Sequence, residues 1–223
     1  MRRLLSSFLL VGILAALAFA GVRMLDGANT ASATNPPSMD SMNVDMDPTG
    51  NTAAGLLAPH TEVLGTIQLC ARADNDGVMN FDEDSIDTLN VDVTAINIPL
   101  VNKMNAFAFS LGYSAPNINV TAADFNFLLK STAGSSTLGA GDETLLPDSD
   151  GSYDAAAADT GGAGAADSGS GVLERLALEA VGAPYLILPL TLSSAAHIDT
   201  GNIARVPDAL NGAKMAAVRQ TPM

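Results

Sequence analysis

Large and small residues alternate through residues 104–113, which read MNAFAFSLGY. One face of an extended chain would carry the large residues, Phe107, Phe109, Leu111 and Tyr113. The opposite face would carry small residues, Ala106, Ala108, Ser110 and Gly112. This period of two predicts a β-strand, followed by a turn at 114–117 and a short apolar return through Ile118 and Val120. The large face should supply the thickest part of a core, and the small face could lie flat under another layer or a partner.

The same alternation predicts further strands on both sides of this segment. They fall at about 61–71, 89–98, 125–129, 172–181, 185–193 and 213–219. The run LNVDVTAINI at 89–98 has Leu, Val and Ala on one face and Asn, Asp and Thr on the other. Such a run is typical of a half-buried strand, and Pro99 should end it. Because only residues 100–103 separate it from the strand at 104, the two are predicted to pair as a hairpin.

Two of these segments carry competing signals. Residues 172–181, VLERLALEAV, are rich in good helix formers, yet polar and apolar positions alternate and glycine or proline bounds the run. We therefore predict a strand there. In residues 185–193, YLILPLTLS, Pro189 cannot donate a backbone hydrogen bond, so this strand should lie at an edge or break at that point. Many short strands with Gly, Pro and Asn turns predict an all-β sandwich.

The N-terminal segment, residues 1–20, reads MRRLLSSFLLVGILAALAFA. Two arginines, an apolar run and a final Ala-x-Ala are typical of a signal peptide that is cleaved after Ala20. The alternative is an uncleaved anchor, because the run from Leu4 is close to the length of a membrane span. Either interpretation predicts export, so we expect the protein to be secreted or to lie at the cell surface.

The composition of the chain after residue 20 predicts three parts. The expected parts are a flexible linker at 21–60, a sandwich at 61–219 and a tail at 220–223. The linker contains one weak strand pattern at 43–50. Residues 131–171, which are rich in Gly, Ala, Ser, Thr and Asp, are predicted to form a mobile excursion outside the core, with one short strand near 152–157.

The charge of the chain limits its partners. Of 223 residues, 24 are Asp or Glu and 10 are Lys or Arg, so the formal net charge is −14. Phosphate backbones and anionic lipids would repel such a chain, which argues against nucleic acid, and a membrane enters only if the N-terminal segment stays uncleaved. Cationic surfaces or dissolved cations suit it better.

The chain has a single cysteine, Cys70, which rules out an intrachain disulfide. Cys70 could be a buried strand residue, form an intermolecular disulfide or act as a reactive thiol.

Three segments resemble the cohesin modules of bacterial polysaccharide-degrading assemblies and the related carbohydrate-binding β-sandwich superfamily. They are 91–99 (VDVTAINIP), 106–120 with its F-x-L-x-Y pattern and short return, and 167–182 with S-G-x-L before an alternating strand. The resemblance covers about residues 61–219. It implies a noncatalytic, jelly-roll-type sandwich outside the cell, with a dockerin-like protein or a polysaccharide as its partner. Ser114 stands where the family usually has Asp or Asn, and no contact residues are carried over.

Two acidic loops have a spacing that suits calcium ligands. Residues 72–83, RADNDGVMNFDE, match much of an EF-hand loop, although Arg72 takes the place of the leading Asp and no helical pattern flanks the loop. A looser calcium-binding turn there would use four side chains, Asp74, Asp76, Asn80 and Glu83. A second loop would use Asp148, Asp150 and Asp154. The alternative in both loops is an acidic turn whose side chains cap backbone groups.

No catalytic constellation is visible in the sequence. The two histidines, His60 and His197, have no second histidine nearby, which argues against zinc, and no G-x-S-x-G motif supplies a nucleophile. The chain has three Tyr and no Trp, so the aromatic side chains that grip sugar rings are scarce. We therefore predict a noncatalytic interaction or scaffolding module, which the resemblance links to polysaccharide degradation. Carbohydrate binding is the alternative, and calcium is the one candidate cofactor.

Overall fold

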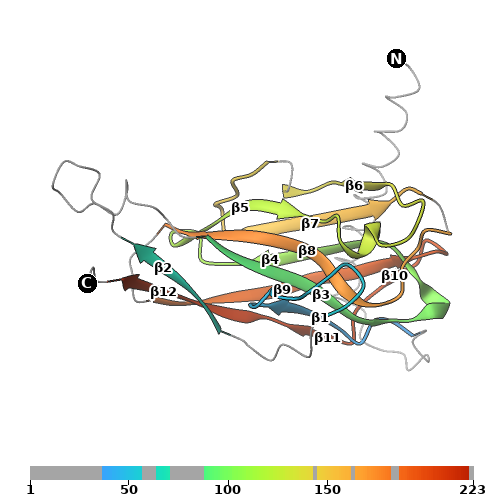
Figure 1. The fold of residues 1–223 in the computed structure, drawn as a ribbon, viewed down its shortest axis with the longest axis horizontal. Coiled ribbons are helices and arrows are strands. Elements are labelled where there is room, and N and C mark those ends of the chain that lie inside the picture. The colour runs from blue at the N-terminus through green and yellow to red at the C-terminus, as the bar shows by residue number, and fades with distance from the viewer. Residues whose placement is uncertain are drawn as a thin grey trace, which may run out of the picture.

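The domain is a sandwich of two β-sheets. We describe it from a computed structural model, which covers residues 37–56, 64–70, 88–142, 145–161, 164–181 and 186–220. The strands of both sheets run roughly along the long axis of the domain (Figure 1). In the part of the chain that the structure describes, no helix is long and apolar enough to cross a bilayer. The architecture confirms the predicted all-β, jelly-roll-type sandwich.

One sheet has five strands in the order β11-β1-β3-β8-β5. Their bounds are Ser41–Asp45 (β1), Thr88–Ile98 (β3), Ile118–Asp124 (β5), Gly169–Ala180 (β8) and Ala209–Asn211 (β11). Neighbouring strands are antiparallel, except that β11 runs parallel to β1.

The other sheet has the order β2-β12-β9-β4-β7-β6, and β10 pairs with β9 beside this path. Its strands are Leu64–Cys70 (β2), Met104–Gly112 (β4), Thr137–Gly139 (β6), Ser152–Asp159 (β7), Leu186–Asp199 (β9), Ala204–Arg205 (β10) and Ala213–Gln220 (β12). Here too one pair is parallel, β12 with β2. Two short 3₁₀ helices, Leu100–Asn102 (η1) and Leu128–Lys130 (η2), lie between strands.

The core fills the space between the sheets, and β4 supplies its bulkiest side chains. Phe107 and Phe109 are buried, with their ring centroids 5.9 Å apart, and the ring of Tyr153 on β7 lies 6.4 Å from that of Phe109. From the other sheet, fully buried apolar side chains include Val91, Val93, Leu176 and Leu178. The burial predicted for the large face of β4 is therefore confirmed.

The predicted hairpin between residues 89–98 and the strand at 104 is wrong. Strand β3 pairs with β1 and β8, whereas β4 pairs with β7 and β9 in the other sheet. Pro99 is extended, and η1 then carries the chain from one sheet to the other. Strand β3 is also buried on both faces rather than half-buried, because Asp92 is inaccessible and Thr94 is only 2% exposed.

The strand predicted at 125–129 does not form. The side chain of Asp124 accepts a hydrogen bond from the backbone N–H of Asn126 at 2.8 Å, which turns the chain at the end of β5. Helix η2 follows, and its Leu128 and Leu129 are buried. The alternation of apolar and polar residues at 125–129 is too short to indicate a strand. It arises because this turn buries two side chains, Leu128 and Leu129, in the core.

The sandwich begins earlier than predicted. Strand β1 pairs with β3 and β11, and Met39, Met42 and Val44 are buried. The weak strand pattern at 43–50 therefore marks a strand, and residues 37–56 belong to the domain rather than to the linker predicted at 21–60.

The low-complexity stretch at 131–171 also contributes to the core, contrary to the prediction. Its short strand is found as β7, which pairs with β4 and β6. Phe107 and Phe109 lie opposite Ala157 and Ala155 in the register. Small residues are needed there, because close packing beside two phenylalanines leaves little volume.

The structure decides both ambiguous segments, residues 172–181 and residues 185–193. Residues 172–180 lie in β8, which confirms the strand over the helix. Strand β9 pairs with β12 at residues 186–190 and with β4 at residues 191–199. Pro189 thus lies in the half of β9 that has no β4 partner, so its missing N–H breaks no bond on that side.

Candidate binding face

A groove of about 260 Å³ lies on the outer face of the sheet, over β6, β7, β4 and β9. Small or apolar side chains line most of it, including Ala106, Ala108, Leu138, Ala156, Ala158 and Ile198. In the sheet register, Ala106 lies between Ala158 and Ile198. The floor is therefore a row of methyl groups across three strands, which could receive an apolar side chain.

The alternation in β4 produces this floor. Because successive side chains of a strand point to opposite faces, burying Phe107 and Phe109 in the core directs Ala106 and Ala108 outwards. Ala108 is recessed, with 3% of its surface exposed, while Ala106 is half-buried. The small face that the sequence singled out is thus the bottom of a groove.

A buried ion pair holds one rim of the groove. Asp199 Oδ1 accepts hydrogen bonds from the backbone N–H groups of Gly201 and Ile203, at 2.8 and 2.9 Å, and its Oδ2 accepts one from Arg205 Nε at 2.8 Å. Burial would raise the pKa of Asp199, but the bonds from Ile203, Arg205 and Gly201 outweigh it and lower that pKa. The turn that carries the rim residue Asn202 is therefore firmly held.

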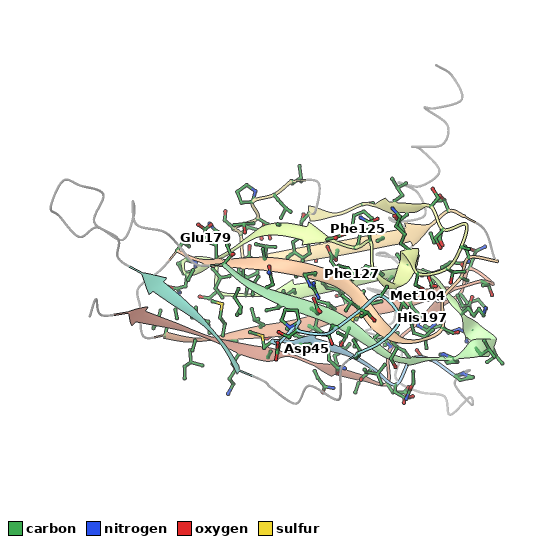
Figure 2. The ribbon with its side chains drawn as sticks, viewed as in Figure 1. Asp45, Met104, Phe125, Phe127, Glu179 and His197 are labelled. Carbon is green, nitrogen blue, oxygen red and sulfur yellow. The ribbon has the colours of Figure 1, made fainter. Side chains whose placement is uncertain are left out.

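His197 is adjacent in sequence to the groove residue Ile198 but points into the sandwich. Figure 2 shows it close to Met104, at the end of the domain opposite Glu179. The side chain is fully buried, its Nε2 lies 3.3 Å from the carbonyl oxygen of Asn102, and its Nδ1 has no partner within the described residues. Burial lowers the pKa of His197 below its ordinary value.

Acid should weaken the fold through His197. Because its pKa is lowered in the folded state, the unfolded chain takes up the proton first. The free energy of unfolding is thus expected to fall as the pH drops below about 6.5, by at most about 1.4 kcal/mol per pH unit. Urea unfolding between about pH 5 and pH 7 measures this slope, and His197→Gln should flatten it. An unchanged slope in the variant would assign the acid sensitivity to other groups.

In the second predicted calcium loop, each acidic side chain accepts a hydrogen bond from another residue of the protein. Asp148 accepts a hydrogen bond from the hydroxyl of Tyr113 at 2.9 Å, Asp150 from the backbone N–H of Ser152 at 3.0 Å, and Asp154 from the hydroxyl of Ser110. Within the described ranges, no three or more His, Cys, Asp or Glu side chains are grouped so that they could hold a metal ion. Residues 72–83, with Asp74, Asp76, Asn80 and Glu83, lie outside those ranges, as does His60.

A second polar cluster, which sequence reasoning missed, lies on the outer face of the other sheet. Arg175 binds both carboxylate oxygens of Asp92, with Nε–Oδ1 and Nη2–Oδ2 distances of 2.7 and 2.9 Å. The amide nitrogen of Asn51 donates to Asp92 and to Asp45. The guanidinium carbon of Arg175 also lies 4.8 Å from the ring centroid of Phe127. The cluster ties β1, β3 and β8 together, and the sequence shows it only as unrelated polar residues in three strands.

Solved structures with similar folds are cohesin modules. A cohesin from scaffoldin B of Acetivibrio cellulolyticus, solved with a Cel5 dockerin, has a TM-score of 0.51 and 13% identity, over 81% of this chain and 99% of that chain. The module folds as a cohesin. A cohesin of a family 33 glycoside hydrolase from Clostridium perfringens matches at a TM-score of 0.50 and 9% identity, over 82% of this chain and 100% of that chain.

Another cohesin, from ScaC of Acetivibrio cellulolyticus and solved with the ScaB dockerin, matches at a TM-score of 0.50 and 12% identity. That match covers 79% of this chain and 99% of the other. No protein-family model and no curated protein matches the chain by sequence. At these identities the similarity establishes the cohesin fold, as the three resembling segments predicted.

The aromatic side chains of the cohesin-like module give little support to sugar binding. Tyr113 is 9% exposed and Tyr153 is inaccessible, with its hydroxyl 2.6 Å from Oε1 of Glu174. Tyr185 lies outside the described residues. The groove floor is built from alanine, leucine and isoleucine and has no tyrosine. A row of exposed tyrosines, which the carbohydrate-binding alternative needs, is not formed by Tyr113 and Tyr153.

Proposed function

We propose that this cohesin-like domain is a noncatalytic interaction module that binds a protein partner of the dockerin type over the groove of β6, β7, β4 and β9. The observation that carries the proposal is the methyl-lined floor around Ala106 and Ala158, set in an acidic protein. Burying such a floor against an apolar side chain of a partner is favourable, since binding energy concentrates in central, dry contacts.

The residues that line the groove support binding rather than chemistry. Asp159 is the only ionisable residue among them, so the groove holds no pair of acid and base groups and no nucleophile activated by a base. A recess lined by small side chains can seat one or two apolar side chains of a protein surface.

The fold and the net charge indicate the class of partner. Two of the similar cohesins were crystallised with dockerins. A chain with a net charge of −14 would attract a partner whose apolar contact is flanked by Lys or Arg, because opposite charges speed association and select against acidic partners. We also propose that the protein is secreted, with the N-terminal apolar run as its export signal. Its role would be in polysaccharide degradation, as the resemblance to cohesin modules implies.

Blocking the groove should abolish partner binding without unfolding the domain. Ala158→Arg places a long cationic side chain on the half-buried floor position, and we expect affinity for a dockerin partner to fall by roughly tenfold or more. Ala122→Arg is the matched control, since Ala122 is exposed on β5 in the other sheet. Proteins secreted by the source organism would be captured on the wild-type domain, identified, and then titrated against all three forms by calorimetry.

Two results would contradict the proposal. One is capture of no dockerin-bearing protein from these secretions. The other is equal affinity of the wild type, Ala158→Arg and Ala122→Arg for the captured dockerin, which would place the contact on another surface. Retention of the domain on insoluble polysaccharide in the absence of protein partners would favour the carbohydrate-binding alternative.

A further inference from the structure

Two buried carboxyl groups, those of Asp159 and Asp167, lie on segments that run along the same edge of β4. Asp167 forms a backbone bridge with Met104, and the last pair of β4 with β7 joins Ala106 to Ala158, which directly precedes Asp159. Asp159 and Asp167 therefore follow one another along the same edge of β4. They are 8% and 3% exposed.

Each carboxylate has one oxygen that is well bonded and one that is not. Asp159 Oδ1 accepts hydrogen bonds from the backbone N–H groups of Ser136 and Gly161, at 2.8 and 2.7 Å. Asp167 Oδ1 accepts them from the hydroxyls of Ser131 and Thr132, at 2.8 and 2.7 Å. The Oδ2 atoms of both residues are buried without a hydrogen-bond partner among the described residues.

The loop at 131–136 contacts both carboxylates and carries a further buried oxygen atom. Its two ends bond to the two carboxylates, and between them Ser135 Oγ is buried without a partner in the described part of the chain. The loop also approaches the turn after β7, where a Cβ on Gly161 would come within 2.2 Å of the carbonyl oxygen of Gly134. The loop therefore contacts both segments that carry the buried carboxyl groups.

Nearby charges act on Asp167 in both directions. Burial, and then the nearby charge of Asp159, raise the pKa of Asp167, while the hydroxyls of Ser131 and Thr132 and the charge of Lys103 lower it; the net direction is upward. Neither carboxylate forms a salt bridge within the described residues. A buried carboxylate oxygen without a hydrogen-bond partner is costly, and a bound cation would relieve that cost.

We propose that Asp159 and Asp167, together with the hydroxyl of Ser135, bind a calcium ion. The available atoms are all oxygens, which calcium prefers, and it accepts irregular arrangements of six to eight ligands, some of them water. Magnesium would require near-octahedral geometry and shorter distances, which a loop joined to two strand ends is poorly built to supply. With only two carboxylates, the affinity should fall in the range of extracellular modules, about 0.1–1 mM.

This site is independent of the identity of the protein partner and of both calcium loops predicted from the sequence. It shares one residue with the groove, because Asp159 lines the rim beside Ala158. Calcium bound there would also fix the 131–136 loop next to β6, the outermost strand of the proposed binding face. The ion would therefore stabilise one rim of the groove without contacting the partner.

Thermal unfolding with calcium or with chelator tests the proposal on the purified protein. Calcium at about ten times its dissociation constant should raise the melting temperature of the wild type by roughly 3–6 °C, because it binds only the folded state. Asp159→Asn/Asp167→Asn should lose this rise, whereas the exposed control Asp208→Asn and the loop variant Asp74→Asn/Asp76→Asn should keep it. A melting temperature that calcium leaves unchanged, or a rise that persists in the Asp159→Asn/Asp167→Asn variant, would overturn the site.

A second measurement does not depend on how the variants fold. The backbone amides of Ser136 and Gly161 donate to Asp159, so their NMR signals should shift saturably as calcium is added to the wild type. Magnesium at the same concentration should shift them less. Signals of both amides that do not move with calcium would contradict calcium binding at Asp159.

Discussion

Replacing Arg175 with Met is expected to lower the free energy of unfolding by about 2–4 kcal/mol, because it leaves the carboxylate of Asp92 buried and without its cation. Asp92 is inaccessible to solvent, and both of its oxygens bind the guanidinium group. The hydrogen bond that Arg175 donates to Asp92 raises the pKa of Arg175, so the guanidinium group stays charged. The side chain of Arg175 is 30% exposed, which places the expected loss at the lower part of the range for buried pairs.

Urea unfolding of two further variants separates the causes of this loss. In Asp92→Asn/Arg175→Met the uncompensated charge is removed, so part of the lost stability should return. Asp124→Asn is the control, because this exposed residue lies opposite Arg175 in the register of β5 with β8 but has no salt bridge to it within the described residues. A loss below about 0.5 kcal/mol for Arg175→Met would mean that Asn51 and water satisfy Asp92 without the cation.

The strand pattern was predictable from the sequence where large residues alternate with small or polar ones. Strands β4, β8 and β12 are of this kind, because one face of each is packed and the other is not. Strand β7 is different, since its sequence SYDAAAAD offers almost no contrast in size between its two faces. Its alanines are required by the phenylalanines of β4 opposite them, which no local pattern can reveal.

The pairing of strands was less predictable than their existence. Strands of both sheets point their large side chains towards the same core, so alternation does not say to which sheet a strand belongs. The short connection at 100–103 therefore suggested a hairpin, although it crosses between the sheets. Parallel pairs such as β1 with β11 also join segments that are far apart in the chain, and they leave no local signal.

The candidate binding face could be predicted only in part. Ala106 and Ala108 stood out because they alternate with phenylalanine, but Ala156, Ala158 and Ile198 reach the same groove only through the order of β7, β4 and β9. Asp159 and Asp167 looked like solvated residues of a low-complexity stretch. They are buried because both segments run alongside the first residues of β4.

The second large effect is expected for Phe109→Ala, which should cost about 3–5 kcal/mol of stability. The ring of Phe109 is fully buried between those of Phe107 and Tyr153, and it lies opposite Ala155, which is too small to fill the space that the ring would leave. Phe125→Ala is the matched control, since Phe125 is only partly buried at the border of the core and should cost less than half as much.

The same variant distinguishes folding from binding. Phe109 does not line the groove, because its side chain leaves β4 on the face opposite Ala108. Molecules of Phe109→Ala that remain folded, at low temperature and without denaturant, should therefore bind the dockerin partner with wild-type affinity, whereas Ala158→Arg should fold normally and fail to bind. Loss of affinity in folded Phe109→Ala would mean that the two faces of β4 are coupled, since the groove floor could then not keep its shape without the ring beneath it.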